Sequence, residues 1–367
     1  MASAQGSERD RRYLRLAFRL ARKAAGRTSP NPMVGAVLVR SGKIVGAGYH
    51  HYAGGDHAEI NALKHAGTKA KGATLYITLE PCCHQGRTPP CTRALIAAGV
   101  RRVVAGVQDP NPLVGGRGFQ QLRRAGIPVR AGVCQQEAAQ LIEAFSKFVT
   151  KRLPFVTVKL AATLDGKIAS ASGDARWVSS ERSRARVQRW RNEMDAVLVG
   201  AGTVRADDPL LTCRIAGGRN PYRVVLDSRL RITLGAQLLH LPDPGKTIIA
   251  TTEKAPVKKV RALEKLGVTV WRLPSRNHRV AWRPLLRKLA GLGVVAVLIE
   301  GGAAVAASAL QEKIVDKLEL FYAPKIVGGD GRAMIGALGI DKIARALTIR
   351  RYDIRRSGAD LLLSAYL

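Results

Sequence analysis

Acidic residues are scarce in this chain. Its 367 residues include 27 Asp and Glu against 60 Lys and Arg, so the formal net charge is +33 at pH 7. The basic excess is present in both halves and is not confined to a tail. It is compatible with nucleic-acid binding or with an arginine-rich surface suited to phosphorylated ligands. The second interpretation is favoured, because no aromatic-interleaved basic stretch and no helix-turn-helix pattern stands out.

Long apolar runs and a disulfide-type cysteine pattern are also missing. The longest strongly apolar run, residues 294–299, is far too short to span a bilayer. The N-terminus is polar and charged, so no signal peptide is expected. Of the five cysteines, three fall within residues 82–91, which indicates metal ligation and not a disulfide framework. We therefore expect a soluble, cytoplasmic protein with no membrane partner.

The length exceeds that of a usual single core and predicts two domains. A predicted helix over residues 136–149 gives way to a proline and then a strand, so we expect domains at 1–150 and 151–367. No internal repeat and no low-complexity linker is visible. Both halves alternate strands and helices, which is typical of α/β domains. The strands predicted in the second half cover residues 155–160, 195–200, 222–227, 247–251, 268–273, 294–300 and 317–322.

Two short strings in the first half indicate zinc chemistry. Glu59 follows His57 by two positions, and eight residues separate Cys82 from Cys91. One imidazole and two thiolates can hold Zn²⁺ and leave its fourth position for water. A nearby glutamate that does not bind the metal can take a proton from that water and pass it to a departing amine. The pattern predicts a zinc-dependent base deaminase, since a closed structural zinc site gains nothing from the acid.

The predicted secondary structure explains how these ligands converge. His57 and Glu59 stand at the start of a predicted helix over residues 58–66, where the positive end of the helix dipole favours anions. A predicted strand delivers Cys82, and Cys91 begins the next helix. Ligands from two adjacent helix starts can then meet at one ion.

Four neighbouring side chains leave alternatives in the ligand set. Cys83 and His84 directly follow Cys82 and could compete for zinc, although strand alternation and the proline before Cys82 favour Cys82. His50 and His51 could bind metal or substrate, and a loop histidine is more often a polar contact than a ligand.

Further strings accompany the metal pattern, and they are Pro30-Asn31-Pro32-Met33-Val34-Gly35, Gly48-Tyr49-His50, Gly86-Arg87-Thr88-Pro89-Pro90-Cys91 and Asp109-Pro110-Asn111-Pro112. Together they resemble the bifunctional deaminase–reductase family of riboflavin biosynthesis. The resemblance implies a cytidine-deaminase-like three-layer αβα domain. It implies that His57, Cys82 and Cys91 are the zinc ligands and that Glu59 is the catalytic acid–base. It also implies that Asn31 and His50 are substrate contacts. Deaminases of tRNA bases carry a shorter spacing, Pro-Cys-x-x-Cys, which argues against such substrates here.

The second half has no Gly-x-Gly-x-x-Gly string after a strand, so the usual dinucleotide fingerprint is absent. A predicted strand instead ends at Glu300, and Gly301 and Gly302 lead into a helix. Strand, glycine pair and helix start can cradle a phosphate on backbone N–H groups. The alternative is a plain turn.

Residues 158–169, 177–180, 200–209 and 225–228 resemble the reductase half of the same family, which has a dihydrofolate-reductase-like α/β fold. The resemblance implies NADPH as hydride donor. The matching cofactor contacts are Ala161, Trp177, Thr203, Asp207, Ser228 and Gly302. The matching substrate contacts are Arg191, Leu211, Arg214 and Glu300, with Lys159 as a further candidate. An arginine such as Arg191 or Arg214 can bind the substrate's phosphate through a bidentate fork.

At three positions the sequence allows more than one interpretation. Asp207 could donate a proton, orient the substrate, or with Asp208 cap a helix or turn. The family usually has proline where this chain has Asp56, a carboxylate that could raise the pKa of Glu59 or point to solvent. It also tends to have serine where this chain has Ala175, so one substrate hydrogen bond, net about 0.5–1.5 kcal/mol, is missing or replaced by water.

The resemblance covers nearly the whole chain and implies a two-step enzyme. It implies deamination of 2,5-diamino-6-ribosylamino-4(3H)-pyrimidinone 5′-phosphate, followed by reduction of the ribosyl side chain to give 5-amino-6-(ribitylamino)uracil 5′-phosphate. The expected partner is this small phosphorylated pyrimidine, and the family suggests a homodimer through the reductase domain. Two alternatives are an RNA base deaminase with an accessory domain and a non-catalytic nucleic-acid-binding relic. Both predict salt-sensitive RNA binding.

Overall fold

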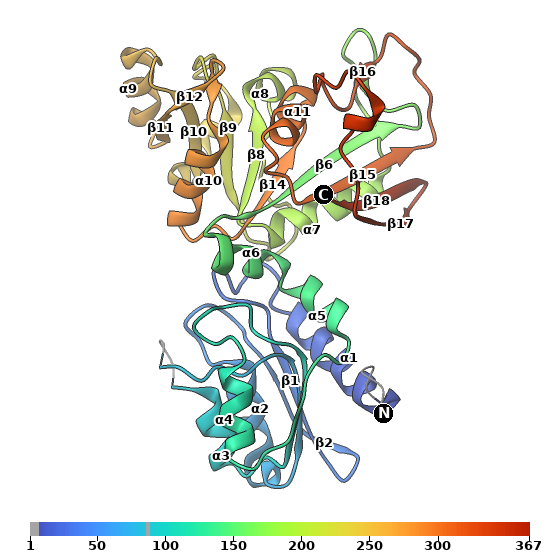
Figure 1. The fold of residues 1–367 in the computed structure, drawn as a ribbon. Coiled ribbons are helices and arrows are strands. Elements are labelled where there is room, and N and C mark those ends of the chain that lie inside the picture. The colour runs from blue at the N-terminus through green and yellow to red at the C-terminus, as the bar shows by residue number, and fades with distance from the viewer. Residues whose placement is uncertain (1–6, 86–88) are drawn as a thin grey trace. The chain divides into compact units, whose positions relative to one another are not determined.

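The computed structural model describes residues 7–85 and 89–367 (Figure 1). The chain divides into two compact units, one ending at Leu153 and the other beginning at Pro154. The first unit ends with α6 (Glu143–Lys151), which Arg152 terminates in the left-handed region at φ +55°. In the described part of the chain, no helix is both long and apolar enough to cross a bilayer.

The first unit is built on a five-stranded sheet in the order β2-β1-β3-β4-β5. Strand β1 is antiparallel to both of its neighbours, while β3, β4 and β5 run parallel. Parallel strands place their carboxyl ends at one edge, and the site described below begins there. The strands are β1 (Gly35–Arg40), β2 (Lys43–Tyr49), β3 (Thr74–Leu79), β4 (Arg102–Val107) and β5 (Val129–Arg130).

Helices cover both faces of this sheet, which gives the predicted three-layer αβα arrangement (Figure 1). One face packs against α1 (Glu8–Arg22) and α5 (Gln135–Leu141). The other packs against α2 (Ala58–Ala66), α3 (Cys91–Ala97) and α4 (Arg117–Arg124). Ser7 caps α1 by accepting a hydrogen bond from the Asp10 backbone N–H.

The single helix predicted over residues 136–149 is wrong, because the structure has α5 and α6 there. The break is at Ile142, whose backbone leaves the helical region at φ −113° and ψ 16° while its side chain is buried. Neither glycine nor proline marks this position. Tertiary packing of one side chain overrides the local helical preference.

The second unit contains a nine-stranded sheet in the order β11-β10-β9-β8-β14-β6-β15-β18-β17. The strands from β11 to β15 are parallel, and the antiparallel hairpin β18–β17 completes the edge. The nine strands are β6 (Phe155–Thr163), β8 (Ala196–Gly200), β9 (Tyr222–Leu226), β10 (Thr247–Thr252), β11 (Thr269–Leu273), β14 (Ala296–Glu300), β15 (Lys317–Ala323), β17 (Arg351–Ser357) and β18 (Asp360–Tyr366). Two small ribbons pair β12 (Ser275–Arg276) with β13 (Arg279–Val280) and β16 (Arg332–Ala333) with β7 (Lys167–Ala169).

Helices of the second unit bury an apolar core against the parallel strands. A cluster of valine, leucine and isoleucine from β8, β9, β10 and β14 packs against α8 and α9, with Trp190 of α7 at its border. The carboxyl ends of β6, β8, β9 and β14 therefore meet at one edge, where α/β sheets commonly bind ligands. The helices are α7 (Glu181–Glu193), α8 (Ala201–Asp207), α9 (Val257–Lys265), α10 (Trp282–Gly291) and α11 (Ala303–Gln311). Short 3-10 helices cover Gly67–Ala70, Gln237–His240, Pro244–Lys246 and Ile343–Arg345.

Candidate active sites

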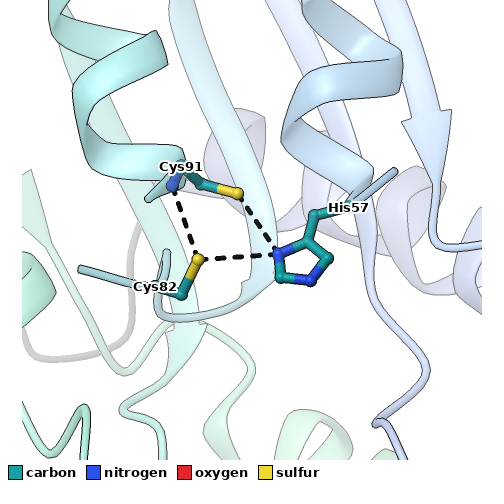
Figure 2. A group of neighbouring side chains, drawn as sticks. All are labelled: His57, Cys82 and Cys91. Carbon is teal, nitrogen blue, oxygen red and sulfur yellow. Dashed lines mark hydrogen bonds between the residues drawn. The ribbon is translucent and has the colours of Figure 1, made fainter. Parts of the chain in front are cut away.

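One histidine and two cysteines of the first unit converge as the sequence predicts (Figure 2). His57 is the N-cap of α2, Cys91 is the first residue of α3, and Cys82 lies in the segment after β3. Their ligand atoms all lie within 4.8 Å of one another. The Nδ1 atom of His57 is 3.5 Å from the Cys82 Sγ and 3.3 Å from the Cys91 Sγ.

The donor chemistry of this cluster fits zinc. Hydrogen bonds from Cys91 and His57 lower the pKa of Cys82 to about 4, although burial opposes this shift. The Cys91 pKa is raised, chiefly by its hydrogen bond to Cys82 and by burial, because two adjacent sulfurs share one proton. One imidazole nitrogen and two sulfurs are the donors that Zn²⁺ prefers. Within residues 7–85 and 89–367, Cys83 does not join this metal-ligating group.

Glu59 is the acid beside this cluster. It lies in the first turn of α2 and is 3% exposed. Burial raises its pKa to about 7, the charge of Cys82 adds to the shift, and His57 opposes it. A carboxyl group with a pKa near neutrality can both accept and release a proton.

Glu59 and two of the ligands, His57 and Cys82, border a cavity of about 320 Å³ that Asn31 and His50 also line. The Asn31 Nδ2 lies 3.1 Å from the His50 Nε2, and the His50 Nδ1 lies 3.0 Å from the carbonyl oxygen of Asp56. Because that carbonyl can only accept, Nδ1 carries the proton and Nε2 accepts from Asn31. Both predicted substrate contacts thus have fixed orientations.

The neighbouring residues that the sequence left open have distinct positions. His51 is exposed and stacks on Tyr49, with ring centroids 4.1 Å apart. His84 borders the cavity, and its buried Nδ1 has no hydrogen-bond partner among the described residues. The Asp56 carboxylate lies 2.5 Å from the Lys64 Nζ. It therefore pairs with an exposed lysine, and the main causes of the raised pKa of Glu59 are burial and the charge of Cys82. The Gly86-Arg87-Thr88 part of one quoted string lies outside the described residues.

The second unit has a glycine turn, here called the cradle, at the carboxyl ends of β8 and β14. Gly301 and Gly302 have φ values of +83° and +81°, and Gly302 is the N-cap of α11. A Cβ on Gly302 would lie 3.3 Å from the Thr203 Oγ1, and one on Gly200 would lie 2.7 Å from Val305. The starts of α8 and α11 are therefore close, and the first N–H groups of a helix are donors that can bind an anion.

Three charged side chains meet beside this cradle. Arg191 of α7 forms a two-point ion pair with Glu300 at the end of β14, with Nε–Oε1 and Nη2–Oε2 distances of 2.6 and 2.9 Å. The Arg191 Nη1 also donates to the Thr212 carbonyl oxygen. Lys159 of β6 is buried, which lowers its pKa, while the charge of Glu300 raises it. Arg191 is thus already paired with Glu300, whereas Arg214 is exposed. Both stay predicted substrate contacts.

The other residues predicted for this half lie on several different elements. Ala161 is in β6, and Asp207 is the last residue of α8. Asp208 follows as the C-cap of that helix, and its carboxylate accepts a hydrogen bond from the Gln237 side chain. The Ser228 Oγ accepts from the Val280 N–H. Trp177 is 61% exposed, with the Arg184 guanidinium 4.6 Å from its ring centroid. Leu211 is buried in the apolar core at φ +56°.

Comparisons with known proteins identify the family. The family model "Cytidine and deoxycytidylate deaminase zinc-binding region" matches residues 7–107, and "RibD C-terminal domain" matches residues 154–363. The riboflavin biosynthesis protein RibD of Aquifex aeolicus is 45% identical over 357 residues, which cover 97% of this chain and 98% of the relative. That of Actinobacillus pleuropneumoniae is 43% identical over 352 residues, covering 96% and 93%. The chain belongs to the RibD family.

Solved RibD structures agree with this assignment. Acinetobacter baumannii RibD has a TM-score of 0.86 at 37% identity, covering 98% of this chain and 99% of that structure. A Thermotoga maritima protein described as a diaminohydroxyphosphoribosylaminopyrimidine deaminase/5-amino-6-(5-phosphoribosylamino)uracil reductase has a TM-score of 0.85 at 37% identity, covering 98% of each chain. The predicted fold class is confirmed. So is the prediction of an enzyme with a zinc-binding deaminase domain and an NADPH-dependent reductase domain.

Several residues that line the deaminase cavity had no role in the sequence-based prediction. Asp109, Asn111 and Val114 come from the connection between β4 and α4, and Phe145 comes from α6. Burial raises the pKa of Asp109 to about 6, although its hydrogen bond from the Asn111 N–H opposes this. The string Asp-Pro-Asn-Pro marked the first two as unusual. No local pattern marks Phe145.

Proposed function

We propose that the first unit removes the 2-amino group of 2,5-diamino-6-ribosylamino-4(3H)-pyrimidinone 5′-phosphate, and that the second unit reduces the ribosyl side chain with NADPH. The product is 5-amino-6-(ribitylamino)uracil 5′-phosphate. One observation carries this proposal: a buried glutamate with a near-neutral pKa borders the same cavity as a His-Cys-Cys cluster. Membership in the RibD family supports the choice of substrate.

In the deamination, His57, Cys82 and Cys91 would hold the zinc ion. When bound, zinc supplies the Lewis acidity that makes water a nucleophile at neutral pH. Glu59 would take the proton released as water attacks the ring carbon and would give it to the amino group that leaves as ammonia. Asn31 and His50 are already oriented by their mutual hydrogen bond and would position the pyrimidine.

In the reduction, the cradle between α8 and α11 would bind the cofactor, which donates the hydride when bound. The proposed contacts with the cofactor are Ala161, Trp177, Thr203, Asp207, Ser228 and Gly302. Glu300 and Lys159 would hold the opened ribose and move a proton to its heteroatom, with Arg191 keeping Glu300 ionised and oriented. Arg214 offers an exposed guanidinium for the phosphate, and Leu211 would border the substrate through its backbone.

A direct assay tests both steps. The purified protein, with its zinc content measured, is mixed with the diaminopyrimidinone phosphate with and without NADPH, and the products are separated by mass. We expect replacement of one amino group by oxygen without NADPH, followed by a gain of two hydrogens when it is added. No reaction by a zinc-loaded protein would contradict the proposal.

The net charge of +33 favours a second candidate, an RNA base deaminase. RNA binding measured at two salt concentrations separates the candidates, because neutralisation of many phosphates gives a steep salt dependence. The proposed function predicts weak binding and no deamination of RNA. We also propose a cytoplasmic location, where NADPH is supplied.

We further propose a homodimer through the second unit. Every residue from 341 to 356 is exposed, including the edge strand β17. Apolar side chains are among them, with Ile343 at 91%, Tyr352 at 65% and Ile354 at 56% exposure. A second copy would cover this apolar edge. Light scattering should give twice the chain mass, and Ile354→Asp should give one chain mass; a wild-type monomer would contradict the dimer.

A further inference from the structure

Glu80 is a buried carboxylate of the deaminase unit that the proposed chemistry does not use. It directly follows β3, two positions before Cys82, and is 3% exposed. Its oxygens accept three backbone hydrogen bonds from the connection between β4 and α4 and from the start of that helix. The N–H groups of Asp109 and Gly116 reach Oε2 at 3.1 and 3.0 Å, and that of Phe119 reaches Oε1 at 3.0 Å.

Two of these contacts satisfy the start of α4. Gly116 is the N-cap of this helix, at φ +89°, and has no side chain that could cap it. The first N–H groups of a helix have no partner within the helix, and a carboxylate there also interacts favourably with the dipole. The fit is close, since a Cβ on Gly118 would lie 2.1 Å from the Pro81 carbonyl oxygen. Glu80 therefore caps α4 from a segment distant in the sequence, the stretch after β3.

The segment of residues 109–116, which Glu80 holds through hydrogen bonds, forms one wall of the deaminase cavity. Asp109, Asn111 and Val114 all line the cavity, and Glu80 holds the N–H groups at the two ends of this stretch, those of Asp109 and Gly116. The zinc ligands and Glu59 come from other segments, namely α2, the stretch after β3 and the start of α3. Glu80 shares the stretch after β3 with Cys82, so the zinc content of a Glu80 variant shows whether the reacting centre stays in place when the wall moves.

We infer that Glu80 is a positioning residue for the deaminase, whose carboxylate fixes the wall of residues 109–116 against which the substrate binds. This inference rests on the proposed function. It predicts a change in substrate affinity with little change in the chemical step. In kinetic terms, KM rises while kcat is preserved.

Glu80→Gln tests this inference with almost no change in shape. The amide has one acceptor oxygen where the carboxylate has two, so at least one of the three N–H groups faces an NH₂ donor. We expect the KM for deamination to rise about tenfold with kcat within about twofold of wild type. Zinc content should stay at one per chain, and reduction of the deaminated intermediate should be unchanged. Glu137→Gln, an exposed position on α5, is the matched control and should leave KM unchanged.

Amide hydrogen exchange measures the strength of the three hydrogen bonds to Glu80 in the absence of substrate. In Glu80→Gln the amides of Asp109, Gly116 and Phe119 should exchange faster than in Glu137→Gln, whether or not the wild type deaminates the proposed substrate. Unchanged exchange together with an unchanged KM would overturn the inference, as would loss of kcat at constant KM. If Glu80→Gln loses zinc, Glu80→Asp decides: it keeps the charge but is one methylene shorter. A KM of Glu80→Asp that exceeds the wild-type value by up to severalfold supports positioning, and a KM equal to the wild-type value overturns it.

Discussion

The carboxylate of Glu300 and the guanidinium of Arg191 form a two-point ion pair, and both side chains are almost removed from solvent, at 9% and 12% exposure. The pair joins the end of β14 to α7, so it fixes a charged group beside the glycine cradle. Burial raises the pKa of Glu300, but the charge and hydrogen bonds of Arg191 outweigh burial, and the net shift is downward. Glu300 is therefore an ionised carboxylate in the folded protein at neutral pH.

Glu300→Gln should cost stability as well as reductase activity. Removing one member of a buried pair leaves an uncompensated charge, and we expect a loss of about 3 kcal/mol in the free energy of unfolding. Urea unfolding measures it. Asp341→Asn is the control, because its pair with Arg345 is exposed and is worth about 0.5 kcal/mol or less. Deamination should be unaffected. Equal stabilities of Glu300→Gln and the control would contradict this account of the pair.

Lys159 predicts that the free energy of unfolding depends on pH. Burial lowers its pKa in the folded state, and the nearby Arg191 adds to this, against the attraction of Glu300. Between the folded pKa and the unfolded value, near 10.4, the unfolded chain binds more protons, so stability rises with pH in this window. The wild type should therefore gain stability relative to Lys159→Met as pH rises toward about 10. Unfolding curves at several pH values measure this difference, and a constant difference would contradict the lowered pKa.

Removal of zinc should separate the two activities. After dialysis against a strong chelator we expect deamination to fall more than about 100-fold, while reduction of the deaminated intermediate continues. Added Zn²⁺ should restore the first step. Cys82→Ser should abolish zinc binding, whereas the adjacent Cys83→Ser should bind one zinc per chain and stay active. Zinc loss in Cys83→Ser with retention in Cys82→Ser would reverse the proposed ligand choice.

The zinc cluster was predictable because its information is local. His57, Cys82 and Cys91 are chemically unusual residues at the starts of predicted elements, and α2 begins at the predicted residue. The choice of Cys82 over Cys83 rested on strand alternation and on the proline before Cys82, and the grouping of Cys82 with His57 and Cys91 agrees with it. Short strings sufficed because each ligand stands at the start of a helix or within three residues of the end of a strand.

Contacts between distant segments were not predictable in the same way. The pairing of Arg191 with Glu300 joins residues 109 positions apart, and no periodicity encodes it. Phe145 lines the deaminase cavity from α6, which begins after the helix break at Ile142, and no local pattern predicts that break. These features depend on how elements pack, which residue types alone do not specify.

The hairpin of β17 and β18 was missed for a different reason. In the strand Arg351–Ser357 four of seven residues are charged and every position before Ser357 is exposed, so the alternation of Tyr352 and Ile354 with polar residues is only a weak sign of a strand. Its pairing is fixed by β18, whose Asp360 carboxylate accepts hydrogen bonds from the backbone and hydroxyl of Ser180. An edge strand held by its neighbour leaves little signal in its own sequence.

The most direct test of the central claim is the activity of Glu59→Gln in the two half-reactions. The amide has the same shape but cannot carry the proton, so we predict a fall in the kcat of deamination of about 10²–10⁴-fold at unchanged zinc content. Reduction of separately supplied deaminated intermediate by NADPH should proceed at the wild-type rate. Deamination at the wild-type rate by Glu59→Gln would contradict the assignment of Glu59, and with it the account of the first site.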